Sequence, residues 1–564
     1  MTRPASGPVS DLPWPLVWTG AWIVLVGAAL VLRPPLPVDE TRYLAVAWEM
    51  WTGGDYLVPH LNGETYSHKP PLLFWLMTAG WHVVGVVDWW PRMVAPLFGL
   101  ACLFLTNRLA RALWPEGGRH MGPSAALILL GSVYWALYTT LTMFDMMLAA
   151  CTLAALLGLV AAWRSGRWTG FLVYGLAIGV GVLAKGPAIL LHTLPVALLA
   201  PWWAPRLAGP ATGFGGWGRW YLAVLGGVLL GAAVGLAWAI PAGIAGGEEY
   251  RNAIFWGQSA GRMVESFAHG RPWWWYLVVT PVLFLPWVVW PPLWRGVRAL
   301  FGAGGAATRG DGGLRLCLAW FLPAFIAFSA ISGKQPHYLL PQFPALALAA
   351  SLLLHRAADG RWGCPRRTDG LVPGLLFAGL GLAAVVASWL PLAERLPDTA
   401  APHGAAALLA LLAGLVVAAM WVRTPPTGTR AVAAVAGLSV VLALAAHLAL
   451  APTLSALFDL RPVARQLAAW QADGQAIANF GKYHGQYQFL GRLTAPVTVV
   501  GLDRGDLAAW LATHDRGKVV TLRRHAPPAD GPQPALDAPF RGRHLVVWDI
   551  AQVRANPELP ERND

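Results

Sequence analysis

Charged side chains are scarce in this chain. Asp, Glu, Lys and Arg make up 12% of its 564 residues and hydrophobic residues 56%, whereas a soluble protein has roughly 25% charged residues. This balance excludes an ordinary soluble globular domain. Lysine is especially rare, and Arg supplies most of the positive charge instead. The five lysines are Lys69, Lys185, Lys334, Lys482 and Lys518.

Cysteine is also scarce. The four cysteines lie in apolar runs or basic loops, none follows residue 364, and their spacing does not match a metal-binding motif. They are Cys102, Cys151, Cys317 and Cys364. Structural disulfides and a cysteine-ligated metal are therefore not expected.

Long apolar runs are abundant instead. Runs of about 18–22 residues recur over the first 450 positions, and each can cross a hydrocarbon core about 30 Å thick. The first run, 16–32, has full length and lacks a small-residue cleavage pattern, which favours a span over a signal peptide. The sequence predicts an integral polytopic membrane protein. Although the net charge is +13, the arginines occupy short loops, so no nucleic-acid partner is expected.

The basic loops orient the predicted spans. Cytoplasmic loops are rich in Arg and Lys, so loops such as 106–120 and 356–367 are expected inside. Thirteen helices follow, with the N-terminus inside: 16–32, 91–112, 123–141, 146–163, 169–184, 187–204, 220–242, 273–294, 315–332, 336–354, 371–391, 404–422 and 431–450. The apolar run 71–87 does not fit this alternation. It is predicted to lie in or dip into the outer interface, within a first external loop, 33–90.

The tail is different in character. Residues 452–564 have ordinary polarity, and strand-like segments alternate with helix-like ones. This pattern predicts a small external α/β domain after a membrane domain, 1–451. No internal repeat is evident.

With this orientation, unusual polar residues gather on the outer side. They are Asp39, Glu40, Arg42, Tyr43, Asp55, His60, Asn62, Tyr66, His68, Lys69, Asp145, Lys185, Glu248, Glu249, Arg251, Gln258, Arg262, His269, Arg271, Lys334, His337 and Tyr338. A single Lys at a helix end often only extends its ammonium to the interface, and "VDETRYL" could be a plain helix start. Asp145 lies in a very apolar context, where a carboxylate is costly and usually functional, so it is a candidate catalytic residue together with Asp39. The joint occurrence on one side predicts a shared site.

The residue types indicate the chemistry. Several cations at the outer interface would hold a phosphate or pyrophosphate at headgroup depth, and Lys suits a phosphate approached from several sides. Asp39 could act as a general base on a hydroxyl, or hold a sugar hydroxyl or a metal. A candidate divalent metal would involve Asp39 and His68. The set predicts group transfer from a phosphate-activated lipid.

The segment "VDETRYLAVAWEMWTGGDYLVPHLNGETYSHKPPLLFWL" closely resembles the first external loop of bacterial lipid-carrier-dependent glycosyltransferases. These protein O-mannosyltransferase-like enzymes of GT-C type include the lipid A aminoarabinose transferases. "LAKGP" and "KQPHYLLPQFPALALA" resemble further motifs of the family, and the likeness extends through the tail.

The resemblance implies an undecaprenyl-phosphate sugar as donor and an active site facing the periplasm of the inner membrane. It implies that Asp39 is the key acidic residue, beside Arg42 and Tyr43, and that Lys69 contacts the donor phosphate. Further cavity positions are implied at Tyr66, Asp145, Lys185 and Tyr338, and Arg262 and His269 are candidates. His68 stands where the aminoarabinose transferases carry Glu, so the reaction type is implied more strongly than the sugar.

The leading hypothesis is an inverting glycosyltransferase with lipid A, another envelope glycan or a protein as acceptor. The alternatives are a transporter or flippase of lipid-linked sugars and a non-catalytic lipid-binding subunit. A transporter is expected to show paired repeats and polar groups near the bilayer midplane, whereas the charges here lie at one face.

Overall fold

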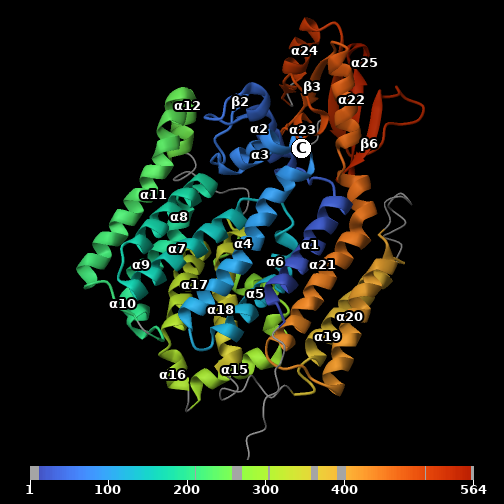
Figure 1. The fold of residues 1–564 in the computed structure, drawn as a ribbon. Coiled ribbons are helices and arrows are strands. Elements are labelled where there is room, and N and C mark those ends of the chain that lie inside the picture. The colour runs from blue at the N-terminus through green and yellow to red at the C-terminus, as the bar shows by residue number, and fades with distance from the viewer. Residues whose placement is uncertain are drawn as a thin grey trace, which may run out of the picture.

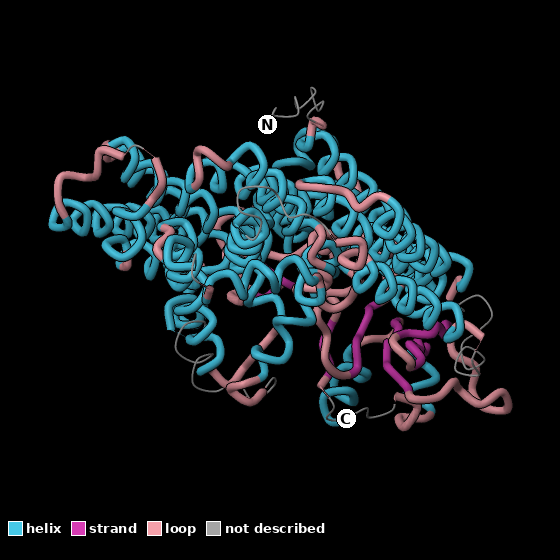
Figure 2. The backbone as a smooth tube through the Cα atoms, turned by 90° about the horizontal axis from the view of Figure 1, so that it is seen from below, coloured by secondary structure: helices cyan, strands magenta, loops and turns pink. Residues whose placement is uncertain are grey.

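The computed structural model describes residues 12–209, 211–256, 270–302, 305–356, 366–389, 402–501 and 504–560. Helices pack side by side through most of the molecule, and a small mixed sheet lies at one end beside the C-terminus (Figures 1 and 2). Nine helical stretches in the described residues are long and apolar enough to cross a membrane. The chain is therefore a polytopic α-helical membrane protein, as predicted.

The first half of the bundle begins with α1 (Trp14–Leu32) and the external-loop elements. These are α2 (Asp39–Gly53), β1 (His60–Leu61), β2 (Glu64–Thr65) and α3 (Leu72–Val84). There follow α4 (Trp89–Leu113), α5 (Gly118–Leu130), α6 (Val133–Tyr138), α7 (Asp145–Ser165), α8 (Thr169–Lys185), α9 (Ile189–Leu198) and α10 (Ala200–Trp203).

The second half contains α11 (Trp217–Ala245), α12 (Gly247–Asn252), α14 (Trp275–Leu283), α15 (Pro291–Phe301), α16 (Gly305–Arg309) and α17 (Gly312–Ala330). A 3₁₀ segment, η6 (Pro336–Gln342), leads into α18 (Phe343–Arg356). The bundle ends with α19 (Leu371–Ala387), α20 (Gly404–Arg423) and α21 (Thr429–Phe458).

Four of the predicted spans are divided in the structure. The segment predicted as 187–204 divides at Leu199 into α9 and α10, and the segment predicted as 336–354 divides into η6 and α18. The segment predicted as 273–294 divides into α14 and α15, because Pro286 and Pro291 interrupt the helical hydrogen bonds between them. The segment predicted as 123–141 divides at Gly131, where a Cβ would lie 2.6 Å from Ala436 and 2.8 Å from Trp287. The close packing of α21 against this point favours a kink. The total of thirteen crossings stays a prediction.

The apolar run predicted at the outer interface is α3. Its 13 residues span about 20 Å, which is shorter than a hydrocarbon core of about 30 Å. It lies with α2 at the same end of the bundle as the sheet (Figure 1). Its length is thus compatible with the predicted placement in the interface.

The Arg-bearing loops contact one another at the other end. Arg164 on α7 donates to Ala112 O at 2.7 Å and to Ala208 O at 2.9 Å. Arg295 on α15 pairs with Asp369 just before α19 at 2.5 Å. In Figure 1, α10, α15 and α16 lie at this end, opposite the sheet. The loops predicted to share one membrane side therefore share one end of the bundle.

After α21 the chain forms α22 (Arg461–Ala472), β3 (Ala476–Phe480), α23 (Gln488–Gly491), β4 (Thr498–Val500), α24 (Arg504–Thr513), β5 (Gly517–Arg523), β6 (Leu536–Phe540), β7 (Arg543–Asp549) and α25 (Ile550–Ala555). The strand order is β4-β3-β5-β7-β6, with β3 parallel to β4 and β5 and with β7 antiparallel to β5 and β6. The division into domains at residue 452 stays a prediction.

Candidate functional site

The first group of polar residues lies on the opening turns of α2. Asp39 begins the helix, where a carboxylate is favoured by the helix dipole. Arg42 forms an ion pair with Asp39, and the Tyr43 hydroxyl donates to Asp39 Oδ1 at 3.3 Å. Burial, followed by the Asp39 charge, raises the pKa of Tyr43 well above its ordinary value. Tyr43 therefore stays protonated and can donate this hydrogen bond at any physiological pH.

The second group lies where α7 and α8 meet. Asp145 begins α7 and is buried, with 1% of its surface exposed. Lys185, the last residue of α8, donates to Asp145 Oδ1, and the Tyr138 hydroxyl lies 3.3 Å from Oδ2. The Lys185 ammonium is also 5.3 Å from the centre of the Tyr338 ring. A carboxylate and an aromatic face thus hold Lys185 in place.

The third group precedes α3. Lys69 Nζ lies 5.7 Å from the centre of the Phe144 ring, and the Tyr43 ring lies 4.9 Å from Phe144 on another side. Tyr66 is buried, and its ring centre lies 5.2 Å from that of His68. Phe144 thus connects the start of α2 to Lys69 and directly precedes Asp145.

A cavity of about 520 Å³ brings the second and third groups together. Its polar lining residues are Ser67, His68, Lys69, Lys185, His192 and Tyr338. Its apolar walls come from α7, α8, α9 and α11 and include Leu148, Ile178, Val182, Leu190, Val228, Ala232, Leu236 and Ala239. The volume is typical of a small-molecule site. The cavity offers two ammonium groups beside an apolar trough.

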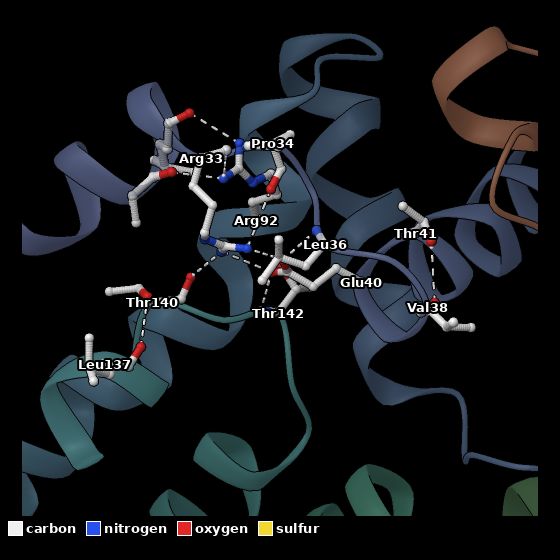
Figure 3. Close-up of polar contacts among 12 residues, drawn as sticks. Arg33, Pro34, Leu36, Val38, Glu40, Thr41, Arg92, Leu137, Thr140 and Thr142 are labelled. Carbon is white, nitrogen blue, oxygen red and sulfur yellow. Dashed lines mark hydrogen bonds and ion pairs between the residues drawn. The ribbon is translucent and has the colours of Figure 1, made fainter. Parts of the chain in front are cut away.

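A buried ionic network supports the first two groups (Figure 3). Arg33 pairs with Glu40, and Glu40 also accepts hydrogen bonds from the N–H groups of Leu36 and Thr142, each at 2.8 Å. Arg92 donates to Ala29 O, Leu30 O and Arg33 O from α4. The network joins the end of α1, the start of α2 and the loop before Asp145.

The importance of this network was not recognised from sequence, where Glu40 was only one of many loop residues. Burial raises the pKa of Glu40, but the charges of Arg33 and Arg92 and the hydrogen bonds outweigh it and hold the pKa at about 2. A usable signal existed: Arg92 lies within a long apolar run, where a charge is expensive unless it is paired or bonded to carbonyls.

Not every predicted residue reaches the cavity. Lys334 is 3% exposed and donates to the backbone carbonyls of Arg271, at 3.0 Å, and Ile331. It thereby ties the chain after residue 270 to the end of α17. His337 lies beside Tyr138 and Tyr338, with ring centres 5.9 and 4.9 Å away. Arg262 and His269 lie outside the described residues.

Two polar cavity residues, Ser67 and His192, were missed. His192 is 1% exposed and shares a hydrogen bond with Gln342 at 2.8 Å. As for the candidate metal, no three His, Cys, Asp or Glu side chains within the described ranges gather closely enough to hold an ion. Asp39 and His68 therefore do not belong to a three-ligand set in this part of the chain.

Part of the chain is similar in sequence to known glycosyltransferases. The family model described as dolichyl-phosphate-mannose-protein mannosyltransferase matches residues 68–215. An undecaprenyl phosphate-alpha-4-amino-4-deoxy-L-arabinose arabinosyl transferase of Edwardsiella ictaluri is 32% identical over 65% of this chain and 62% of its own length. A second such transferase, from Pseudomonas fluorescens, is 30% identical over 62% of this chain and 60% of its own length. The matches thus span about three fifths of these curated relatives.

Solved structures extend the likeness. ArnT from Cupriavidus metallidurans bound to undecaprenyl phosphate superimposes with a TM-score of 0.73 at 19% identity, covering 95% of this chain and 98% of the other. Its apo state gives a TM-score of 0.71 at 20% identity. The predicted resemblance is confirmed in sequence over about two thirds of this chain, and the GT-C type of fold is confirmed by a superposition that covers 95% of it.

Proposed function

We propose that this protein transfers a sugar from a polyprenyl-phosphate donor, undecaprenyl phosphate being the expected carrier, to a cell-envelope acceptor. Lipid A or a related glycolipid is the favoured acceptor class. The curated relatives and the undecaprenyl phosphate bound to ArnT support this reaction class. The proposal includes an inner-membrane location, with the cavity and the C-terminal sheet on the periplasmic side.

The cavity carries the proposal. A polyprenyl phosphate is an amphiphile with a compact anionic head and a long apolar chain. The cavity of about 520 Å³ matches both parts of such a lipid: Lys69 and Lys185 can bind the anionic head, and walls of aliphatic side chains can contact the apolar chain. Each ammonium can donate charge-assisted hydrogen bonds to phosphate oxygens, and the trough can bury isoprene units at about 25 cal/mol per Å² of apolar surface.

The two lysines stabilise the leaving group. In the reaction, an acceptor oxygen forms a bond to the anomeric carbon of the sugar while the bond from that carbon to the phosphate oxygen breaks. The electron pair leaves with the polyprenyl phosphate, and the charge that develops there faces Lys69 and Lys185. A single displacement of this kind inverts the anomeric centre.

Asp39 and Asp145 have different roles in this proposal. Asp39 is half exposed and reaches an incoming acceptor. It takes the proton if the acceptor is a hydroxyl, and it orients the acceptor if an ionised phosphate attacks, because no proton then moves. Asp145 is buried under Lys185 and acts as a positioning residue for that ammonium.

The orientation rests on the basic loops. Their arginines lie at the end of the bundle opposite the sheet, and cytoplasmic loops are those enriched in Arg. The cavity therefore faces the periplasmic leaflet in this proposal.

Intact-mass spectrometry of envelope lipids tests the function. Lipid A and other glycolipids are compared from cells with no protein, wild type, Asp39→Asn, Lys69→Ala and the control Arg298→Ala. Arg298 is an exposed cation on α15 at the other end of the bundle. We expect a sugar-sized mass increment in wild type and control, reduced at least about 100-fold in the two site variants.

Two results would contradict this function. A sugar-sized mass increment that persists in both Asp39→Asn and Lys69→Ala would show that transfer does not need this site. Redistribution of the donor lipid between leaflets without any glycosylated product would instead favour a transporter.

A further inference from the structure

A segment from the C-terminal part of the chain lies directly on α2. In this segment, residues 481–492, a Cβ at Gly485 would lie 2.4 Å from Leu61 Cδ1 and 3.1 Å from Ala45 Cβ. Gln488 donates to the Asn62 side chain at 2.6 Å, and the Trp48 indole donates to Leu493 O at 2.9 Å. The contact is therefore close and made by specific hydrogen bonds.

The contact brings two further basic side chains toward Asp39. Ala45 lies three residues after Arg42, on the same face of α2, so the segment that covers Ala45 lies beside Arg42. Lys482 and His484 precede Gly485 in this segment. Burial, Arg42 and Lys482 lower the pKa of His484, Asp39 raises it, and Arg541 lowers it, with a net decrease. His484 is thus within electrostatic reach of the charged pair on α2 and of Arg541.

Arg541 belongs to a hollow in the sheet. The hollow measures about 300 Å³ and is lined by Leu522, Phe540, Arg541 and Arg543. Phe540 and Leu522 pack in the same apolar cluster as Tyr483 and Tyr487 of the segment on α2. The Arg541 N–H donates to Leu457 O at 2.9 Å, in the last turn of α21. The hollow therefore lies between the segment on α2 and the end of a membrane helix.

These cations belong to a different part of the fold from those of the donor cavity. Lys69 and Lys185 line the cavity between α7, α8 and α11, whereas Lys482, Arg541 and Arg543 come from the C-terminal sheet and its loops. The start of α2 contacts both sides: Tyr43 packs on Phe144, next to Lys69, and Ala45 packs under Gly485. Asp39 thus stands between two cationic regions.

We propose that Lys482, His484, Arg541 and Arg543 form a second anion-binding site, which holds a phosphate of the acceptor next to Asp39. The apolar floor of the hollow, Leu522 and Phe540, accommodates the lipid part of that acceptor. The proposed occupant is a phosphorylated lipid. This inference rests on the proposed function and deepens it, because it assigns acceptor recognition to the C-terminal part of the chain.

Transfer kinetics with the purified full-length protein test this site. The donor is polyprenyl-phosphate sugar, and the acceptor is lipid A with its phosphates or the same lipid after phosphatase treatment. The variants are Lys482→Ala, Arg541→Ala and their double, with Arg516→Ala as control. Arg516 is an exposed cation beside the other end of β5, about 20 Å along the strand from Leu522.

We expect the double variant to raise the KM for phosphorylated lipid about tenfold or more, since charge-assisted hydrogen bonds are the strong ones. The KM for the donor and kcat at saturating acceptor should change less than twofold, and Arg516→Ala should match wild type. With the phosphatase-treated lipid, wild type and double variant should transfer equally poorly, because the group that these cations bind is absent.

Other outcomes overturn the proposal. An equal rise in KM with Arg516→Ala would indicate general attraction of an anionic surface, and a rise in donor KM would assign these cations to the donor. Preferred transfer to the phosphatase-treated lipid or to a protein would exclude a phosphate acceptor.

Binding of the phosphorylated lipid without donor separates this inference from the proposed function. Binding that depends on Lys482 and Arg541, with no transfer by wild type, would support the site and contradict the transferase. Transfer by wild type, with lipid binding that does not depend on Lys482 and Arg541, would support the transferase and contradict the second site.

Discussion

The carboxylate of Glu40 is buried among Arg33 and the N–H groups of Leu36 and Thr142. Its pKa of about 2 in the fold lies below the ordinary value of 4.5. A lowered carboxyl pKa contributes stability that is present above pH 4.5 and is lost as the pH falls through 2. The difference corresponds to a contribution on the order of 3 kcal/mol at neutral pH.

Glu40→Gln should therefore lower the free energy of unfolding by about 3–5 kcal/mol at pH 7, because Arg33 loses its buried partner. The difference from wild type should shrink as the pH falls from 5 toward 2. Thermal unfolding in detergent at several pH values measures this. Glu64→Gln, at an exposed position in β2, is the control and should stay within about 0.5 kcal/mol. A difference independent of pH would show that Glu40 is not ionised in the fold.

A second residue-level prediction concerns the Asp145–Lys185 pair. If Asp145 positions Lys185, then Asp145→Asn should weaken donor binding, and the loss in Lys185→Met and in the double variant should be similar. The coupling energy in a double-mutant cycle should lie between about 1 and 3 kcal/mol. Additive losses would mean that the two side chains act independently. Equilibrium binding of polyprenyl phosphate is the measurement.

The sequence motifs placed the candidate residues at the correct end of the helix bundle. They did not predict which group each side chain contacts. Lys69 and Lys185 were predicted to lie at one site, and both line the cavity. Lys334 was predicted with them, yet its ammonium bonds to backbone carbonyls instead. Composition and spacing place a lysine at a membrane face, whereas its rotamer depends on packing with distant segments. Glu40 was overlooked for the same reason, because its partners lie up to 102 positions away.

At the scale of elements, helices were predicted well where apolar runs are uninterrupted, as in α7, α8 and α20. Prediction failed at two kinds of break: at the prolines between α14 and α15, a local signal that was overlooked, and at Gly131, where the break depends on tertiary packing. The kink at Gly131 depends on contact with α21, about three hundred residues later, and no local signal announces it. Segment 481–492 belongs to the tail through which the family resemblance extends, but its contact with α2 depends on tertiary packing that the sequence does not show.

Gly485 offers a sharp test of that contact. Gly485 and Gly474 both have φ of +73°, but a Cβ at Gly474 would meet nothing within 4 Å, while one at Gly485 would meet Leu61 at 2.4 Å. Both Ala variants therefore share the backbone strain of a left-handed residue, about 1–2 kcal/mol, and only Gly485→Ala adds a clash. We expect Gly485→Ala to lower Tm further and to reduce transfer severalfold. Equal effects of the two variants would mean that the segment does not pack tightly on α2.

At the scale of the whole molecule, the arrangement has a polar end with α2, α3 and the sheet and an opposite end with the basic loops. If α3 lies in the interface, a reporter fused after Arg119 should read as cytoplasmic and one fused at the C-terminus as periplasmic. If α3 spans the membrane, the reporter after Arg119 should read as periplasmic. Paired phosphatase and fluorescent-protein fusions distinguish these outcomes.

The scarcity of lysine has a practical consequence. Only five primary amines occur on side chains, and two of them, Lys69 and Lys185, line the same cavity. A membrane-permeant acylating reagent followed by peptide mapping therefore works as a footprint of this cavity. Lys518 in the C-terminal part, which pairs with Asp549 and belongs to neither proposed site, serves as the internal reference for reagent dose. Protection of Lys69 and Lys185 by a lipid phosphate would report occupancy directly, without a labelled donor and without knowledge of the sugar.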